Sequence, residues 1–167
     1  MTPSLKPIVA SFHTTDMVLS LALADLTEQD ARRRARNEEG PSISWHVGHM
    51  LDCRYSVLRL LGIVKESPYK VKFGSGRATD GSDYPSTADF LRQWKQLEAE
   101  MKEAVDAATE ESLARTLEKG PHGERTVLDK IAFLAWHEAA HIGSLGSIRK
   151  ALGYPGLAEL VRAQAAA

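Results

Sequence analysis

Apolar residues recur at steps of three and four along four long segments of this chain, and this spacing constrains its fold more than any other feature. The segment that begins at Ser86 or Thr87 shows it most clearly, with apolar positions at Phe90, Trp94, Leu97, Met101, Val105 and Ala108. A repeat of this kind predicts an α-helix with one buried face. The same spacing predicts helices from about residue 8 to 26, from 42 to 61 and from 126 to 152.

These four segments predict an all-α fold, because no segment shows the convincing alternation of apolar and polar residues that is typical of a strand. The Gly-, Ser- and Pro-rich segment 65–86 predicts a long crossover connection between the second and third helices. We therefore expect a four-helix bundle with one long crossover. Residues 1–167 are expected to form a single domain, since a chain of this length can bury one good core.

The charge composition bears on the class of partner. The chain has 21 Lys and Arg against 22 Asp and Glu, so no excess positive charge is present to neutralise phosphates, and we expect no nucleic-acid partner. Charges break every apolar run before the roughly 20 residues that a membrane-spanning helix needs. The first residues lack the basic and apolar regions of an export signal, so a soluble, cytoplasmic protein is expected.

Two histidines interrupt the apolar face of the last predicted helix. His137 and His141 lie one turn apart in 137-HEAAH-141, and they continue the inward-facing series of Val127 and Leu134. A buried polar group without a hydrogen bond costs roughly 1–3 kcal/mol, so each imidazole needs a partner. Histidines spaced by four residues on one helix can bind the same metal ion, and H-E-x-x-H is also the helix signature of zinc metallopeptidases.

The second predicted helix offers a matching set of donors. His46, His49 and Cys53 lie at positions i, i+3 and i+7 and so share one face. One ligand from this helix and two from the last helix would leave positions on a metal open for water or substrate. The spacing alone does not decide between His46 and His49, and Cys53 is favoured as a small core residue rather than as a ligand.

Two motifs resemble those of the DinB/YfiT-like superfamily of small four-helix-bundle proteins. They are 45-WHVGH-49 and 136-WHEAAHIGSLGSIRKALG-153, in this order along the chain. The resemblance implies that His49, His137 and His141 bind a divalent metal such as zinc or nickel, often in a homodimer. It leaves two readings of His46, as a residue that supports a ligand or as a surface residue.

Two further positions in the second motif bear on the resemblance. Ser144 departs from the family, which often has glutamine there. Arg149 matches a family arginine, but a cation in the last turn also interacts favourably with the helix dipole, and we favour that interpretation.

The resemblance implies a metal-dependent enzyme, either a thiol S-transferase that uses a low-molecular-weight thiol or a hydrolase, acting on a small molecule. A metal held by neutral imidazoles can activate water or a thiol and can polarise a carbonyl, which suits both reactions. The alternative is a metal- or ligand-binding stress-response module without turnover. A small metallopeptidase is less favoured, because its third ligand would have to be Glu159 and no edge strand is predicted to align a peptide.

Three supporting roles are predicted near this site. Glu138, next to His137, could act as a catalytic base, or it could face a neighbouring helix. Asp52 could accept an imidazole N–H, or it could be a solvated acid paired with Arg59. The substrate pocket is expected to draw on the crossover, with the candidate lining residues Tyr69, Phe73, Arg77 and Tyr84.

Overall fold

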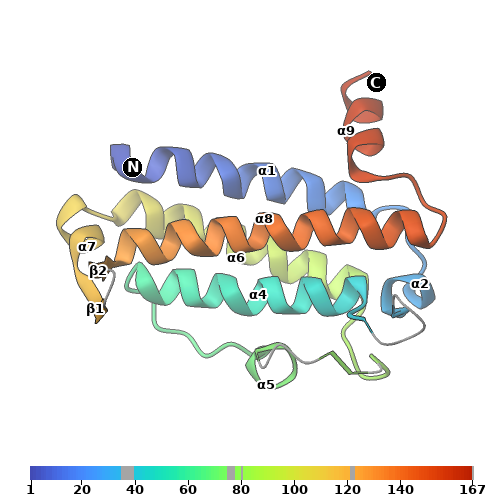
Figure 1. The fold of residues 1–167 in the computed structure, drawn as a ribbon, viewed down its shortest axis with the longest axis horizontal. Coiled ribbons are helices and arrows are strands. Elements are labelled where there is room, and N and C mark those ends of the chain that lie inside the picture. Colours follow the sequence, from blue (N-terminus) through green and yellow to red (C-terminus); the bar gives the residue numbers. More distant parts are fainter. Residues whose placement is uncertain (35–39, 75–77, 80, 121–122, 167) are drawn as a thin grey trace.

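Four long helices lie side by side in the computed structural model, which describes all residues except 35–39, 75–77, 80, 121–122 and 167 (Figure 1). These helices are α1 (Lys6–Leu23), α4 (Ile43–Leu60), α6 (Thr87–Ala107) and α8 (Val127–Ala151). The shorter elements are η1 (Pro3–Leu5), α2 (Glu28–Arg32), α5 (Lys70–Phe73), α7 (Glu110–Ala114), β1 (Thr116–Gly120), β2 (Gly123–Thr126) and α9 (Leu157–Ala165). The prediction of an all-α four-helix bundle with a long crossover between its second and third helices is confirmed.

Local capping explains where the long helices begin. The side chains of Ser42, Ser86 and Thr126 each accept a hydrogen bond from a backbone N–H in the first turn of α4, α6 and α8. Such caps satisfy N–H groups that have no partner inside the helix. Downstream, Gly153 has a φ of 88° just beyond α8, a conformation that glycine adopts without steric cost.

The apolar faces of the long helices form the core. In α6 the predicted positions Phe90, Trp94, Leu97 and Met101 are all buried. Full burial of a large apolar side chain contributes roughly 1.5–3 kcal/mol each. α8 packs against both α1 and α4, and α4 also packs against α6. The inward faces of α4 and α8 therefore meet directly, which places the predicted histidines of both helices at one interface.

The crossover packs onto α4. Tyr69, Phe73 and Tyr84 are buried in a cluster of aromatic rings with Phe90, so the prediction that they line a substrate pocket is wrong. Arg77, the fourth residue of that prediction, lies outside the described residues. Phe73 lies so close to Gly48 that a Cβ built at position 48 would be 2.6 Å from its ring. Glycine at this position therefore allows the crossover to approach α4 closely.

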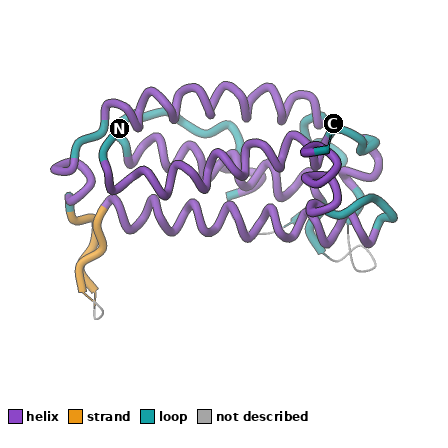
Figure 2. Tube along the Cα trace, turned by 90° about the horizontal axis from the view of Figure 1, so that it is seen from above, coloured by secondary structure: helices purple, strands orange, loops and turns teal. Residues whose placement is uncertain are grey.

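A two-stranded antiparallel hairpin, β1 and β2, departs from the prediction of a chain without strands. It projects from one end of the bundle, immediately before α8 (Figure 2). Its strands have five and four residues, too few for an alternating pattern to be recognised, and their side chains are mostly exposed. Among the helices that the structure describes, none combines the length and hydropathy of a membrane-spanning segment.

Candidate metal centre

His49, His137 and His141 converge at the interface between α4 and α8. The Nε2 atom of His137 lies 3.0 Å from Nε2 of His49 and 3.1 Å from Nε2 of His141. The i, i+4 spacing places two of these rings on the same face of α8, and α4 supplies the third from across the interface. The structure thus brings together all three histidines that the sequence analysis singled out.

The orientation of His49 is fixed from the opposite side of its ring. Its Nδ1 lies 2.8 Å from the backbone carbonyl of Phe73, which can only accept, so Nδ1 carries the proton and donates. Nε2, on the other side of the ring, is then the atom that faces His137. Trp45 stacks on the same imidazole, with the two rings 7° from parallel. A backbone carbonyl from the crossover, and not Asp52, therefore accepts the N–H of this imidazole.

His46 supports His141 from behind. Its side chain is buried, and its Nδ1 lies 2.7 Å from Nδ1 of His141. Burial, followed by the charge of His49, lowers the pKa of His46 to about 4. Burial, followed by the neighbouring histidines, lowers the pKa of His141 to about 3. Both rings are thus neutral at pH 7, and His46 is a buried partner of His141 and not a surface residue.

The donors in this cluster fit a divalent transition metal. Burial, followed by the charges of His49 and Lys130, lowers the pKa of His137, so the His137 ring is also neutral at pH 7. A His141 ring that donates from Nδ1 to His46 also keeps the lone pair on its Nε2. Converging neutral imidazole nitrogens are the ligand type that zinc, nickel, copper and iron all accept. The chemistry of the donors alone does not select among these metals.

Cys53 lies beside the histidines, one turn after His49 on α4. Its Sγ is 3.7 Å from Nε2 of His49. The donor atoms of His49, Cys53 and His137 all lie within 4.8 Å of one another. Burial, followed by the charge of Asp52, raises the pKa of the Cys53 thiol to about 12, so without a metal the group is neutral.

Glu138 lies in the bundle interior and is engaged by other side chains. Its two carboxylate oxygens accept hydrogen bonds from Nε and Nη2 of Arg54, each at 2.8 Å, and one of them also accepts from the hydroxyl of Thr15. Both Glu138 and Arg54 are only 1% exposed. The geometry agrees with the alternative that position 138 faces a neighbouring helix, and a role as catalytic base stays a prediction from the sequence.

Arg54 extends this ion pair into a buried cluster that the sequence analysis missed. Its Nη2 also donates to Asp16 Oδ1 at 2.6 Å, and the same oxygen accepts from Nε1 of Trp94 at 2.8 Å. The Arg54 guanidinium lies 3.6 Å from the centre of the Trp94 ring. A sequence signal existed, because Arg54 falls between apolar residues of α4 that face the core.

Arg149 also serves the fold through specific contacts. It is fully buried, and it donates to the carbonyl of Ala22 at 2.6 Å and to Asp25 at 2.7 and 2.9 Å. It donates as well to the carbonyl of Pro155 at 3.0 Å. Arg149 lies in the last turn of α8, where the dipole interpretation requires a cation, and its guanidinium also ties the end of α8 to the end of α1.

A cavity of about 420 Å³ lies on the His46 side of the centre, and His49, His137 and His141 are not among the described residues that line it. The described residues that line it include His46 from α4 and Ser144 and Ser147 from α8. Ser144 is the position that departs from the family's usual glutamine. The hydroxyls of both serines donate to carbonyls of their own helix, so their lone pairs remain available to a ligand.

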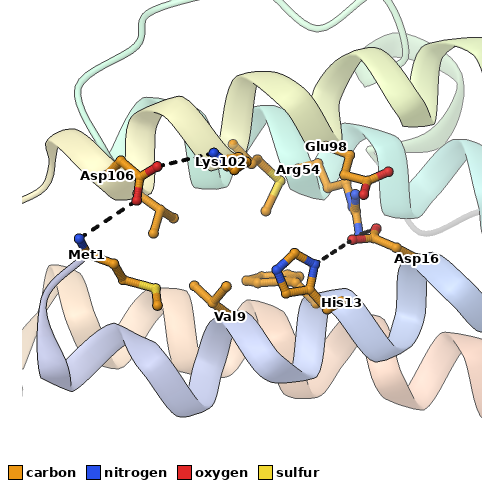
Figure 3. Close-up of a pocket in the computed structure, with 11 residues that line it drawn as sticks. Met1, Val9, His13, Asp16, Arg54, Glu98, Lys102 and Asp106 are labelled. Atoms are coloured by element: carbon orange, nitrogen blue, oxygen red, sulfur yellow. Dashed lines mark hydrogen bonds and ion pairs between the residues drawn. The ribbon is translucent and has the colours of Figure 1, made fainter.

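A second, smaller cavity of about 140 Å³ lies between α1 and α6 (Figure 3). His13 and Asp16 of α1 approach Glu98 of α6 at its edge, and donor atoms of these residues lie within 4.8 Å of one another. The described residues that line this cavity include none of the histidines of the α4–α8 interface. His13 is 64% exposed, so this group lies at the surface of the bundle.

Comparisons with known proteins place the fold and the family. The structure matches that of YfiT from Bacillus subtilis, described as a probable metal-dependent hydrolase with an unusual four-helix bundle topology. The two share 14% sequence identity with a TM-score of 0.69, over 92% of this chain and 91% of that one. No curated protein sequence matches. The family model of the DinB superfamily matches residues 11–145, and this chain therefore belongs to the DinB superfamily.

Proposed function

We propose that this protein is a metal-dependent enzyme of the hydrolase or thiol S-transferase type that acts on a small molecule. The observation on which this rests is the convergence of the Nε2 atoms of His49, His137 and His141. Support also comes from the structural similarity to YfiT, which is described as a probable metal-dependent hydrolase. The ion we propose is zinc or nickel, which the resemblance to the DinB/YfiT-like superfamily implies and which imidazole ligands suit.

The proposed roles of the residues follow from their contacts. His49, His137 and His141 would hold the ion, which would supply a Lewis acid that polarises a carbonyl or activates water or a thiol. Phe73, through its carbonyl, and His46 fix the rings of His49 and His141. The hydroxyls of Ser144 and Ser147 line the adjoining cavity, where they would orient a polar substrate.

A metallopeptidase is disfavoured by the position of Glu159, which would have to be its third ligand. The Glu159 carboxylate lies 3.5 Å from Nζ of Lys150 in an ion pair near the end of α8. His49 instead approaches the HEAAH pair from α4. The three-histidine set therefore explains a residue that the peptidase interpretation leaves without a role.

We also propose a homodimer. The support is a pair of large aromatic side chains on α8, Phe133 and Trp136, which are 44% and 64% exposed. Their rings pack against each other at a centroid distance of 5.7 Å. Exposed neighbouring aromatic residues are typical of protein interaction surfaces.

The test is the metal content of untagged protein by mass spectrometry, after incubation with zinc or nickel and desalting. Wild type should retain close to one ion per chain, and His49→Ala should retain almost none. Ser20→Ala, at an exposed position of α1 outside both groups of candidate metal donors, is the control and should bind like wild type. A wild type that retains no ion would refute the proposal.

Turnover separates the enzyme from the binding module. Loaded wild type and His49→Ala should be screened against ester and amide substrates and against pairs of a low-molecular-weight thiol with an electrophile. We expect metal-dependent turnover that His49→Ala lacks. A protein that retains one ion but is inert in every assay would instead be the non-catalytic metal-binding module.

A further inference from the structure

The Cys53 thiol and the His49 imidazole face the same point between α4 and α8. The two residues are four positions apart on α4, so their side chains project from the same face of the helix. Sγ of Cys53 lies 3.7 Å from Nε2 of His49, the lone-pair nitrogen that faces the other histidines. Cys53 is also the single cysteine of the chain.

The separations in this cluster match those between ligands of one tetrahedral ion. Zinc bonds of about 2.0–2.1 Å to nitrogen and about 2.3 Å to sulfur place two ligands about 3.6 Å apart for nitrogen and sulfur, and about 3.4 Å apart for two nitrogens. The corresponding separations here are 3.7 Å for Cys53 and His49, and 3.0 and 3.1 Å for the pairs of nitrogens. The donor atoms of Cys53, His49 and His137 lie within 4.8 Å of one another, and Nε2 of His141 adjoins this group through His137.

We infer that Cys53 is a fourth protein ligand of the metal, as a thiolate beside His49, His137 and His141. This inference rests on the proposed metal site. In the metal-free protein, the thiol S–H has the lone pair of His49 Nε2 as its acceptor. When an ion enters, the sulfur bonds to the ion, its proton leaves to solvent, and the same lone pair binds the ion instead.

A sulfur ligand changes which ions and substrates suit the centre. Thiolate is a soft donor that favours zinc over harder ions such as magnesium and manganese. Four protein ligands also leave no vacant tetrahedral position, so a substrate atom must displace one ligand or expand the coordination. The coordination position proposed for Cys53 accommodates a sulfur atom, so the thiolate of a low-molecular-weight thiol can take the place of Cys53 there. The inference therefore favours the thiol S-transferase over the hydrolase.

The test uses cobalt(II) in place of zinc, in thiol-free buffer and with untagged protein. A thiolate ligand produces a sulfur-to-cobalt charge-transfer band in the near ultraviolet, and in this chain only Cys53 can supply a thiolate. Zinc-edge X-ray absorption provides a second readout, as one sulfur at about 2.3 Å from the ion. The variants are Cys53→Ser and Cys53→Ala, each checked for folding by circular dichroism, with His49→Ala as the variant that loses the ion.

The outcomes separate this inference from the proposed function. We expect one cobalt ion per chain in wild type with the band, and bound cobalt without the band in both Cys53 variants. The zinc affinity of these variants should fall at least about tenfold. Loss of a residue that only hydrogen-bonds to a metal ligand already lowers metal affinity by about this factor. One bound ion in wild type without band or sulfur signal would overturn the role of Cys53 and leave the three-histidine site standing. No bound ion at all would refute both.

Discussion

The imidazole of His49 is held by residues that are distant in sequence. Phe73 of the crossover accepts its Nδ1 proton, and Trp45 stacks on its face. The carbonyl of Phe73 reaches His49 because the adjacent residue of α4 is Gly48, which leaves room for the Phe73 ring. The absence of a side chain at Gly48 thus contributes to how a candidate ligand is oriented.

Gly48→Ala should therefore weaken both the fold and the metal site. Its Cβ would lie 2.6 Å from the Phe73 ring, so the ring and its backbone must move away from α4. Overpacking of this kind costs typically about 1–3 kcal/mol, and zinc affinity should fall with the lost support of His49. Chemical denaturation and zinc titration measure the two effects.

The matched control for this prediction is Gly143→Ala. Position 143 is an exposed helical glycine of α8 with nothing within 4 Å of an added Cβ. Alanine there should be neutral or stabilise the protein by up to about 1 kcal/mol, because it favours the helix. Equal destabilisation by both substitutions would contradict the role of Gly48.

The carboxylate of Glu138 allows a structural role to be separated from a catalytic one. Glu138→Gln removes the charge that compensates the buried Arg54 and leaves it with Asp16 alone. Breaking a buried ion pair from one side costs about 3 kcal/mol or more, so we expect a loss of that order in unfolding free energy. Metal content should not change, since both oxygens of Glu138 are hydrogen-bonded to Arg54.

The control is Glu118→Gln, which breaks an exposed ion pair with Arg125. Exposed pairs contribute at most about 1 kcal/mol, so this variant should unfold like wild type. If Glu138→Gln were as stable as wild type but lost turnover in the loaded enzyme, Glu138 would be a catalytic base, as the sequence alone allows.

At the scale of elements, α4 and α8 meet through a row of histidines. His46 and His141 lie at its buried end, where desolvation lowers the pKa of both rings. The interface between the two helices therefore depends on these rings remaining uncharged. This dependence makes the packing of α4 on α8 sensitive to acid.

The unfolding free energy of the metal-free protein should fall as the pH is lowered from about 6.5 to about 4. In this window His46 binds a proton in the unfolded chain, where its pKa is 6.5, but not in the folded protein, where it is about 4. The unfolded state therefore takes up more protons, and acid favours unfolding, by about 3 kcal/mol at most from this residue. Denaturant titrations at several pH values measure the slope.

His46→Leu should flatten this pH dependence, and the exposed His13→Gln should leave it unchanged. An unfolding free energy of wild type that stays constant between pH 6.5 and 4 would contradict the prediction. So would an equal slope in His46→Leu and wild type.

The long helices could be predicted because their signals are local. The caps at Ser42, Ser86 and Thr126 and the apolar faces behind them lie within a few residues of the ends they determine. The pairing of β1 with β2 involves strands too short for a pattern. The contact of His49 with the Phe73 carbonyl, 24 residues away, depends on how the crossover packs, which no local pattern encodes.

In the candidate site, too, local features could be predicted and contacts between helices could not. The three histidines stood out because polar residues on an apolar face need partners, which is a property of each helix alone. The choice of Asp16 and Glu138 as partners of Arg54 depends on three different helices meeting in the interior. The environment of Cys53 likewise depends on the packing of α8 against α4, which brings His137 to within 4.8 Å of it.

At the scale of the whole molecule, the bundle separates two kinds of chemistry. The histidines lie between α4 and α8, next to the crossover, whereas the ion cluster of Arg54 lies in the interior toward α1 and α6. The hairpin extends from one end of the bundle and α9 stands at the other (Figure 1).

Phe133 and Trp136 remain exposed along α8, and Phe133 stacks on the His137 ring at 15° from parallel. A partner that covers these aromatics would therefore adjoin the candidate metal centre.

Trp136→Glu should convert the proposed homodimer into a monomer. Burial of an exposed indole contributes roughly 25 cal/mol for each Å² of apolar surface, and a carboxylate placed in the interface would lose its hydration without a partner. Val71→Glu is the control, because Val71 is 91% exposed on α5 and outside the proposed surface. Sedimentation velocity over a range of concentrations should give a dimer for wild type and Val71→Glu and a monomer for Trp136→Glu. A monomeric wild type, or a Trp136→Glu variant that stays dimeric, would contradict the prediction. The contact of these aromatics with His137 would then indicate a role in contacting the substrate.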